Sequence, residues 1–424
     1  MTDLFQEFQW RGQVVNATEG VREMLAREKV TAYIGFDPTA SSLHVGSLVP
    51  IVALQRIQRL GHLPIALIGG GTGLIGDPSG KTAERMLLSA EELHANVGGV
   101  RAQLSKLLAT GPDGRAVRFV DNADWLAKMT AMELLRDVGK YFTVNYLLAK
   151  ESVRRRIEGE EGISYTEFSY SLLQAYDFLV LYDRFKCTLQ LGGGDQWGNI
   201  VAGCDLIRKL RGKQAHGLVM PLLTTSSGTK FGKTESGTIW LDAARTPPFQ
   251  FYQFWLNVDD RDVLGYLKYF TFRTEHEIGE LEQAVQGRPE QREAQRALAR
   301  EVTTMVHGAD QAARAERAGA VLFGGLLAEA SVDDILMVFD DAPSITMSAA
   351  ALEAGVPAAE LAVTTGLAAS KAEAGRLIKQ GGLYVNDRRF TDERGAVTIA
   401  DAISRSVIVL RKGQRERRIV KIQE

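Results

Sequence analysis

The sequence is poor in several features that define specialised protein classes. Only two of its 424 residues are cysteine, Cys187 and Cys204, and they have neither metal-ligand spacing nor a partner motif. This scarcity excludes a disulfide-rich secreted scaffold and a zinc module, and it indicates buried, reduced thiols. No apolar run reaches the ~20 residues of a membrane helix, and the N-terminal "MTDLFQEFQWRG" is unlike a signal peptide. We therefore expect a cytoplasmic protein with no membrane partner.

The charge is balanced in total but not along the chain. The net charge is -2, whereas residues 371–424 hold 13 Lys and Arg against 7 Asp and Glu. The remainder of the chain therefore carries -8. A basic end of this kind favours a polyanionic partner, although a solvated tail is the commoner fate of a run such as "RKGQRERR". With 45% hydrophobic residues, the composition is that of a globular protein, and the length favours about two or three domains.

Two patterns divide the chain. Up to about residue 219, continuous apolar runs such as "TAYIGF" and "LPIALIGG" alternate with helical patterns. This alternation predicts a parallel sheet covered on both faces by helices, with ligands at the carboxyl ends of the strands. From 247 to about 323 the pattern is helical, and beyond 349 a compact α+β unit is expected. Within that unit we expect helices at 359–366 and 372–379, a capping box of Ser370 and Glu373, and a strand pair in "GGLYVNDRRF".

Two glycine-containing loops are the candidates for chemistry. The turn "HVGS" at 44–47 lies between an apolar run and a helix, and His44 alone is as well explained by a capping role. The second loop, "GTKFGKTESG", places Lys230 and Lys233 three residues apart among glycines. It is either a solvated basic turn or a mobile loop whose lysines close over a polyphosphate, where negative charge develops.

Together these loops resemble a known pair of motifs. "HVGS" with "KFGKT" at 230–234, on a parallel α/β domain, resembles the HIGH and KMSKS pair of class I aminoacyl-tRNA synthetases. The segments "YIGFDPTA", "GLIGDPSGK", "EFSYSLLQAYDF" and "GGGDQWGNI" resemble the bacterial type of tyrosyl-tRNA synthetase, and "SKAEAGRLIKQGGLYVND" resembles its terminal S4 RNA-binding module. The resemblance extends over essentially the whole chain.

The resemblance implies an order of domains. It implies a Rossmann-like catalytic domain at 1–222, a segment at 223–246 with the KFGKT loop, and an α-helical anticodon-binding domain at 247–325. A linker at 326–348 and an S4-like RNA-binding domain at 349–424 would follow. Family members are homodimers in which one subunit's tail holds the tRNA that the other subunit acylates, and the same is expected here.

The resemblance also implies a tyrosine site. Tyr33 and Asp177 would bind the phenolic hydroxyl, Asp77, Tyr170 and Gln174 would hold the ammonium group, and Gln196 would contact the carboxylate. The residues themselves support a shared site, because positions 170, 174 and 177 fall on one face of a helix. The alternative, a polar stripe on a solvated helix, fits less well with the apolar neighbours in "SYSLLQAYDFLVLY".

The nucleotide site follows from the loops, again by resemblance. The residues implied in ATP binding or in the transition state are Asp37, Thr39, His44, Gly46, Ser47, Asp195, Lys230, Lys233 and Thr234. The tyrosine carboxylate would attack the α-phosphorus, pyrophosphate would leave with Mg²⁺, and tyrosine would then pass to a terminal hydroxyl of tRNA(Tyr). Positioning and charge stabilisation can carry such a step without a covalent enzyme intermediate. ATP is a substrate here; no tightly bound cofactor and no metal held by the protein alone are expected.

One residue departs from the family pattern. Ser47 occupies a position where the family usually has a histidine or an asparagine, so its reach to the adenosine is open. Three other functions remain conceivable: an RNA-binding protein with a retired active site, a different HxGx nucleotidylyltransferase, and a tryptophan-specific enzyme. The two lysines of the loop, the S4-like tail and the pairing of Asp177 with Tyr33 argue against them in turn. DNA is not an expected partner.

Overall fold

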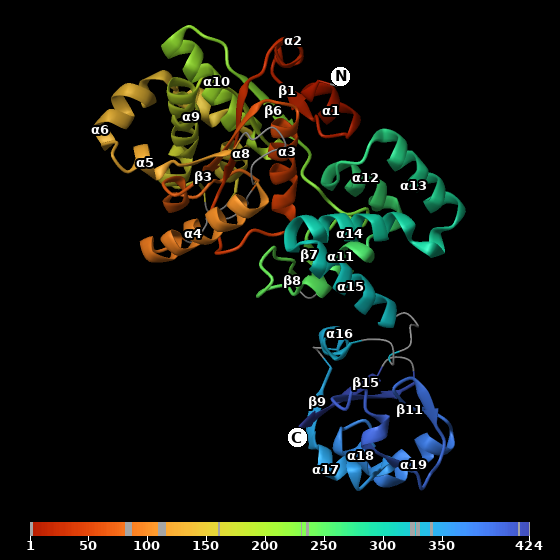
Figure 1. Ribbon diagram of the computed structural model, residues 1–424. Helices are drawn as coiled ribbons and strands as arrows, with labels where there is room; N and C mark the ends of the chain where they lie inside the picture. Colours follow the sequence, from red (N-terminus) through yellow and green to blue (C-terminus); the bar gives the residue numbers. More distant parts are fainter. Residues whose placement is uncertain are drawn as a thin grey trace. The chain divides into compact units, whose positions relative to one another are not determined.

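The computed structural model of the chain describes residues 3–80, 87–108, 116–159, 162–229, 231–234, 237–322, 327, 331–339, 342–413 and 416–423 (Figure 1). Two compact units can be distinguished. One comprises Met1–Pro247 with Phe254–Val306, and the other comprises Pro248–Gln253 with His307–Glu424. The segment 247–325, expected as a helical domain, is therefore divided between the two units.

The first unit is built on a six-stranded sheet. Its strands, in spatial order, are β1 (Asn16–Ala17), β6 (His216–Met220), β5 (Cys187–Gly193), β2 (Thr31–Phe36), β3 (Leu63–Ile68) and β4 (Arg118–Asp121). Strands β2 to β6 are parallel and only β1 runs antiparallel to its neighbour. The chain passes from β2 to β3 and β4 on one side and returns to β5 and β6 on the other, so the strand order reverses between β2 and β5. This confirms the parallel α/β prediction.

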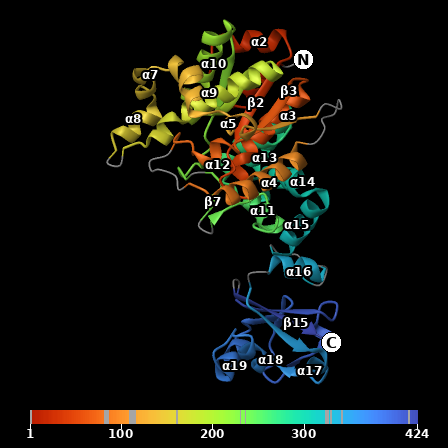
Figure 2. The ribbon, with the colours of Figure 1, turned by 90° about the vertical axis from the view of Figure 1, so that its left-hand side faces the viewer.

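Helices cover both faces of this sheet, as Figures 1 and 2 show. The four that matter most for the site are α3 (Leu48–Arg59), α4 (Ala90–Leu107), α9 (Tyr165–Phe185) and α10 (Trp197–Arg211). Tyr33, Ile65 and Leu67 project from β2 and β3 into one hydrophobic cluster with α9 and α10, whereas α3 contacts the same strands from the opposite face. Because both faces are buried, the strands read as continuous apolar runs.

Shorter helices complete the first unit. They are α1 (Leu4–Trp10), α2 (Val21–Arg27), α5 (Ala123–Leu126), α6 (Ala131–Glu133), α7 (Val144–Leu148) and α8 (Glu151–Ile157). The later helical segment holds α11 (Pro248–Leu256), α12 (Asp260–Phe270), α13 (Glu275–Gly287) and α14 (Glu293–His307), of which α11 and α14 reach into the second unit. Two short strands, β7 (Lys233–Thr234) and β8 (Gly237–Thr238), pair antiparallel.

The second unit carries a five-stranded sheet in the order β12, β11, β14, β15, β9. These strands are β9 (Ser344–Ser348), β11 (Leu383–Val385), β12 (Arg388–Phe390), β14 (Val407–Lys412) and β15 (Glu416–Gln423), and β10 (Val356–Pro357) pairs separately with β13 (Ala396–Val397). The helices of this unit are α15 (Ala309–Leu322), α16 (Val332–Val338), α17 (Ala349–Glu353), α18 (Ala358–Thr364) and α19 (Lys371–Lys379). The strand pair β11 and β12 confirms the expected hairpin.

One expectation for this unit needs correction. Residues 344–348, expected in a linker, form β9, which pairs parallel with β15 at the edge of the sheet. An edge strand has one bonded neighbour only, and the sequence "SITMS" alternates between exposed and half-buried positions, so it lacks the apolar run of a central strand. At α19, Ser370 caps the helix as expected, but the Glu373 carboxylate accepts from the backbone N–H of Ala369 rather than of Ser370.

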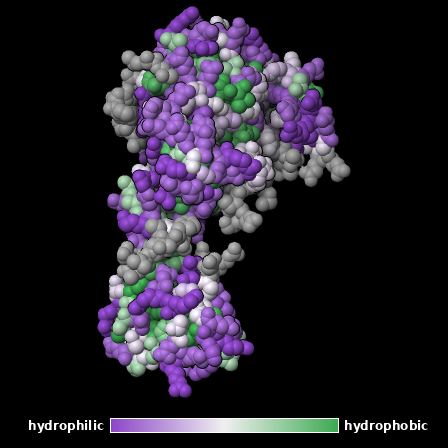
Figure 3. Space-filling model, turned by 90° about the vertical axis from the view of Figure 1, so that its right-hand side faces the viewer, coloured by the Kyte–Doolittle hydropathy of each residue, from purple (hydrophilic) through white to green (hydrophobic). Residues whose placement is uncertain are grey.

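The remaining surface features are simple. The face of the molecule in Figure 3 is largely hydrophilic with small hydrophobic patches. Both cysteines are free, Cys187 buried and Cys204 half-buried, and burial raises the pKa of each thiol. Within the described ranges, none of the helices has the length and apolar character required to cross a bilayer.

Candidate active site

The carboxyl ends of β2, β3 and β5 meet where the strand order reverses, which is where open α/β sheets bind ligands. Asp37 follows β2 directly, and Asp195 follows β5. Glycines leave room for both carboxylates: a Cβ on Gly69 would lie 2.8 Å from Asp37 Oδ1, and a Cβ on Gly193 would lie 2.7 Å from Asp195 Oδ1. The glycine-rich loops therefore serve to admit two acidic side chains at this edge of the sheet.

Tyr33 and Asp177 form the buried end of the site. Both side chains are only 1% exposed, and no hydrogen-bond partner for the Tyr33 hydroxyl occurs among the described residues. Burial, and then the nearby charge of Asp177, raises the pKa of Tyr33 well above its usual value. A neutral phenol that lacks a partner next to a carboxylate is a site that a second hydroxyl group can complete.

Two residues that sequence reasoning missed hold this carboxylate. Trp125 Nε1 donates to Asp177 Oδ1 at 2.7 Å, and Asn122 Nδ2 donates to Oδ2 at 2.9 Å. Burial raises the pKa of Asp177 to about 7, and the two hydrogen bonds act in the opposite direction. Because each oxygen accepts one bond, the carboxylate is fixed in orientation while retaining lone pairs for a ligand.

Asn122 also connects this end of the site to the loop after β3. Its Oδ1 accepts from the backbone N–H of Gly71 at 2.7 Å, and its Nδ2 donates to Thr72 Oγ1 at 2.9 Å. The two missed residues have no distinctive spacing, and the available signal is their place: "NADWL" directly follows the strand run "RFVD" and so lies at the same edge of the sheet.

A closed ring of polar side chains forms the second part of the site. Gln196 Nε2 donates to Asp77 Oδ2 at 2.8 Å, and Gln174 Nε2 donates to Gln196 Oε1 at 3.1 Å. Asn199 Nδ2 then donates to Gln174 Oε1 at 3.1 Å and to Ser79 Oγ at 3.2 Å. The Ser79 backbone N–H returns to Asp77 Oδ1 at 2.8 Å. The structure thus brings together three residues of the expected tyrosine site, and Asn199 and Ser79 are additions to it.

Tyr170 stands between the two parts. It is buried on α9, one helical turn from Gln174 and two from Asp177, and its hydroxyl is hydrogen-bonded to Thr72. Burial raises the pKa of Tyr170 well above its usual value, and the carboxylates of Asp37, Asp77 and Asp177 add to the effect. This confirms the predicted common helical face for positions 170, 174 and 177.

Lys150 lies behind the ring and was also missed. Its ammonium group donates to Ser171 Oγ and, at 3.0 Å, to the backbone carbonyl of Gly198. The side chain is only 9% exposed, and burial lowers the pKa of Lys150 to about 7 despite the favourable charges of Asp77 and Asp205. Lys150 therefore joins α9 to α10 directly beneath the residues that form the ring.

The "HVGS" turn folds back on itself. His44 Nδ1 accepts a hydrogen bond from the backbone N–H of Gly46 at 3.0 Å, so the imidazole carries its proton on Nε2 when neutral. A Cβ on Gly46 would lie 2.7 Å from the same ring, which explains why this position is glycine. Ser47 donates its backbone N–H to His44 O at 2.8 Å, and its side chain makes no capping bond to α3. Thr39 lies in the preceding turn, with its backbone N–H bonded to Asp37 O.

The second loop is joined to this turn by backbone hydrogen bonds. Val45 N–H donates to Ile239 O at 3.0 Å, and Ile239 N–H donates to Gly232 O at 3.2 Å. A Cβ on Gly232 would lie 2.6 Å from Val45 Cγ2. The two motifs, far apart in the sequence, therefore meet. Lys230 lies outside the described residues, and for Lys233 and Thr234 only the backbone, in β7, is described.

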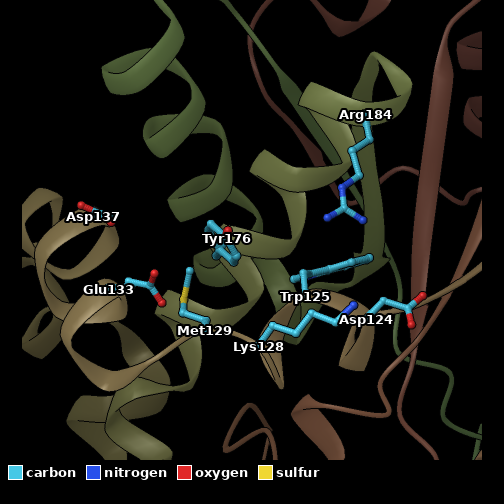
Figure 4. Close-up of a pocket in the computed structure, with 8 residues that line it drawn as sticks. All are labelled: Asp124, Trp125, Lys128, Met129, Glu133, Asp137, Tyr176 and Arg184. Atoms are coloured by element: carbon cyan, nitrogen blue, oxygen red, sulfur yellow. The ribbon is translucent and has the colours of Figure 1, made fainter.

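A surface pocket lies on the outer side of Trp125 (Figure 4). Its volume is about 570 Å³, and it is lined by Asp124, Trp125, Lys128, Met129, Glu133, Asp137, Tyr176 and Arg184. The Arg184 guanidinium carbon is 5.4 Å from the centre of the Trp125 ring. One face of the indole is thus exposed to charged side chains, while its N–H holds Asp177 on the buried side.

Two family descriptions match this chain. Residues 25–324 match "tRNA synthetases class I (W and Y)", and residues 334–420 match "Tyrosine--tRNA ligase SYY-like C-terminal domain". The chain is 53% identical over 423 residues to the tyrosine–tRNA ligase of Roseiflexus castenholzii, with 100% of both chains covered. The chain belongs to the tyrosine–tRNA ligase family. The enzyme of Geobacillus stearothermophilus is 49% identical over 418 residues, covering 98% of each chain.

A solved structure of the family agrees with the fold. The C-terminally truncated mitochondrial tyrosyl-tRNA synthetase of Aspergillus nidulans superimposes with a TM-score of 0.68 at 30% identity, covering 76% of this chain and 95% of that one. A tyrosyl-tRNA synthetase from Archaeoglobus fulgidus, solved with L-tyrosine, shares the fold at 17% identity and a TM-score of 0.55. The resemblance inferred from the motifs is thereby confirmed.

Proposed function

We propose that this chain activates tyrosine with ATP and joins it to tRNA(Tyr), as a tyrosine–tRNA ligase. The observation that carries this function is the buried pair of Tyr33 and Asp177 at the end of a site that opens at the carboxyl edge of the parallel sheet. Relatives that are 53% and 50% identical over nearly the whole chain are named tyrosine–tRNA ligase, which supports the proposed activity.

The tyrosine subsite selects by hydrogen bonding. The phenolic hydroxyl of the substrate donates to the Asp177 carboxylate and accepts from Tyr33, whose hydroxyl otherwise has no partner among the described residues. Phenylalanine would leave both groups buried without a partner, a cost of about 1–3 kcal/mol for each neutral group and more for a charged one. At the other end, Asp77, Tyr170 and Gln174 hold the ammonium group, and Gln196 contacts the carboxylate.

The nucleotide subsite lies at the loops. Asp37, Thr39 and Asp195 flank the ATP, the turn of His44, Gly46 and Ser47 contacts it, and Lys230, Lys233 and Thr234 bind the leaving pyrophosphate. A tyrosine carboxylate oxygen bonds to the α-phosphorus while the bond to pyrophosphate breaks. A terminal hydroxyl of tRNA then attacks the tyrosyl carbonyl, and AMP leaves. Positive charge at the lysines stabilises the charge that develops on pyrophosphate.

Mg²⁺ fits this site as part of the nucleotide complex. The ion keeps several waters and is commonly bound by substrate phosphates with one or two carboxylates, and Asp37 and Asp195 offer carboxylates at the same edge. In the described part of the chain, no group of three or more His, Cys, Asp or Glu side chains could hold an ion alone. When bound, Mg²⁺ would neutralise charge on the phosphates.

The tRNA partner accounts for the remaining segments. We assign anticodon binding to the helical segment 247–325 and RNA binding to the S4-like segment 349–424, whose basic side chains suit a phosphate backbone. Binding would weaken steeply with salt, because each phosphate contact releases a counterion. The enzyme would act in the cytoplasm.

A homodimer is the proposed assembly. Exposed apolar side chains cluster between residues 132 and 165 of the first unit, and they are Met132, Leu135, Val144, Leu148, Ile157 and Tyr165. This concentration of exposed apolar side chains in one part of the chain favours a protein interface there. Light scattering of the full chain should give a dimer mass, and Val144→Glu should shift it towards the monomer. Val15→Glu, at an exposed valine outside this patch, should leave the mass unchanged.

Tyrosine-dependent exchange between ATP and pyrophosphate tests the activity directly. The purified chain should exchange label with tyrosine and remain silent with phenylalanine or tryptophan. Exchange with tryptophan instead of tyrosine would make tryptophan the amino-acid substrate. Silence with all three amino acids in a folded sample would contradict the enzyme and leave an RNA-binding protein.

A further inference from the structure

Phe231 stands between the two lysines of the KFGKT loop and is only 4% exposed. Its ring lies within contact distance of four other aromatic rings of the first unit. The distances between ring centres are 5.7 Å to Phe254, 5.7 Å to Trp255, 4.9 Å to Tyr266 and 5.4 Å to Phe270. Aromatic pairs at these separations attract one another in addition to the burial of their surface. The loop is thus anchored at a single apolar side chain.

A second anchor holds the start of the same loop. The Asp262 carboxylate accepts from the Ser226 backbone N–H, at 3.1 and 3.0 Å to its two oxygens, and from the Ser226 hydroxyl at 3.1 Å. The turn itself is closed by the Thr225 N–H, which donates to Thr229 O at 2.8 Å. A charged acceptor for three bonds fixes this turn more firmly than neutral contacts would.

Both anchors lie on one helix. Asp262, Tyr266 and Phe270 are four residues apart along α12 and therefore project from the same face. Ser226 is bonded to Asp262 on that face, and Phe231 packs on Tyr266 and Phe270 of the same face. Helix α12 therefore holds the loop at Ser226 and at Phe231.

Helix α12 is in turn bonded to α3, the helix that follows the first motif. Arg56, on α3, donates through Nη2 to the carbonyls of Lys268 and Thr271, at 2.9 and 2.8 Å, at the carboxyl end of α12. Arg11 donates to the same two carbonyls. A cation suits the negative end of a helix dipole. Since α3 begins at the residue after "HVGS", α12 contacts both the helix that follows the first motif and the loop that carries the second.

We propose that α12 sets the position of the lysine-bearing loop for tyrosine activation, with Phe231 and Asp262 as positioning residues. The inference rests on the function proposed above. It gives α12, a helix of the segment otherwise assigned to tRNA binding, a role in the activation step. Residues that position the loop are then different from residues that bind tyrosine.

The first test divides turnover from tyrosine affinity. Phe231→Leu leaves a smaller, mobile side chain among the rings, and we expect kcat for pyrophosphate exchange to fall on the order of tenfold, because small misplacements of catalytic groups are costly. The KM for tyrosine should stay within about twofold, since Tyr33 and Asp177 are untouched. Phe231→Met, which is closer in volume and adaptable, should recover most of the loss.

A matched control separates positioning from stability. Phe8→Leu removes the same atoms from a fully buried phenylalanine on α1 that is not one of the rings packed on Phe231. Even if Phe8→Leu lowers the melting temperature as much as Phe231→Leu does, it should leave kcat nearly unchanged. If Phe8→Leu lowers kcat as much as Phe231→Leu, or if Phe231→Leu leaves kcat unchanged, the proposal is wrong.

A second measurement does not depend on activity. Limited trypsin digestion of the full chain reports how often the loop opens locally. Mass spectrometry then measures the peptides that end at Lys230 or Lys233. Phe231→Leu and Asp262→Ala should each speed these cuts several-fold relative to cuts elsewhere, whereas Phe8→Leu should not. Equal cutting in all variants would overturn the inference. A wild-type chain without exchange would contradict the proposed function only, and the digestion would still decide about the anchor.

Discussion

The two halves of the candidate site are held in different ways. Around Asp177, buried side chains from α5, α9 and the loop before α5 form direct hydrogen bonds. Around His44, backbone hydrogen bonds join two loops, the imidazole accepts from the Gly46 N–H within its own turn, and Phe231 anchors the second loop by aromatic packing. The difference follows from the tasks. A hydroxyl group is selected by groups that cannot move or rehydrate, whereas pyrophosphate must enter and leave.

The largest effect should come from breaking the buried half. Asp177→Ala leaves Trp125 Nε1 and Asn122 Nδ2 without their acceptor and removes the acceptor for the substrate hydroxyl. We expect kcat/KM for tyrosine to fall by about 100-fold or more, since each bond to a charged group contributes about 1.5–3 kcal/mol. Pyrophosphate exchange against tyrosine concentration measures it. Tyr176→Phe, at the residue directly before Asp177 but lining the outer pocket, is the control. An equal loss there would assign the effect to a disturbed helix α9 rather than to the missing carboxylate.

A smaller effect should come from the loop half. Gly46→Ala places a methyl group 2.7 Å from the His44 ring, so the imidazole must rotate away from the Gly46 N–H. We expect kcat to fall by about tenfold with KM for tyrosine unchanged, because only groups near the nucleotide are displaced. A rise in tyrosine KM would show that the two halves are less separate than the contacts indicate. Gly98→Ala, in α4 with open space at its Cβ, is the matched control.

The pH dependence of tyrosine activation should sharpen the comparison further. The pKa of Asp177 is raised to about 7, so below that pH the carboxyl is neutral and loses its role as a charged acceptor. kcat/KM for tyrosine should therefore rise with pH through about 7. Trp125→Phe removes a bond that lowers this pKa, so the midpoint should move to higher pH. A midpoint that stays in place in Trp125→Phe would assign the titration to another group.

The last effect concerns the free energy of unfolding and a residue outside both halves of the site. Burial lowers the pKa of His62 to about 4, and its Nδ1 accepts from the Val30 backbone N–H at 3.2 Å. The unfolded chain takes up the proton at its ordinary pKa of 6.5, so this contribution to stability is full above that pH and is lost as pH falls towards 4. Between pH 7 and pH 5, wild type should lose about 2 kcal/mol more stability in urea unfolding than His62→Gln. If stability falls equally with pH in wild type and His62→Gln, His62 is not the group responsible for the loss.

Some of this architecture could be predicted from local sequence. The apolar runs that lead into "FDPTA" and "GGGTG" predict parallel strands. The spacing of Tyr170, Gln174 and Asp177 predicts one helical face. By contrast, Asn122 and Trp125 carry no distinctive spacing, and Lys150 precedes α8 like any surface lysine. Their importance arises only because β4, α9 and α10 meet. The strand β9 was missed for a related reason, since a polar edge strand is recognised only by its partner.

The sequence alone established the class of fold, the family, and the residue types that can bind a hydroxyl group and a polyphosphate. These depend on periodicity and on short motifs, which survive without long-range contacts. Only the tertiary structure decided which groups complete the site: that Trp125 and Asn122 orient Asp177, that the Gly46 position is closed by His44, and that Phe231 is seated on α12. The partners of Asp177 and of Phe231 lie tens of positions away in the sequence, whereas His44 and Gly46 are two residues apart and meet through the conformation of their turn. The buried pairings form because burial makes an unsatisfied partner costly.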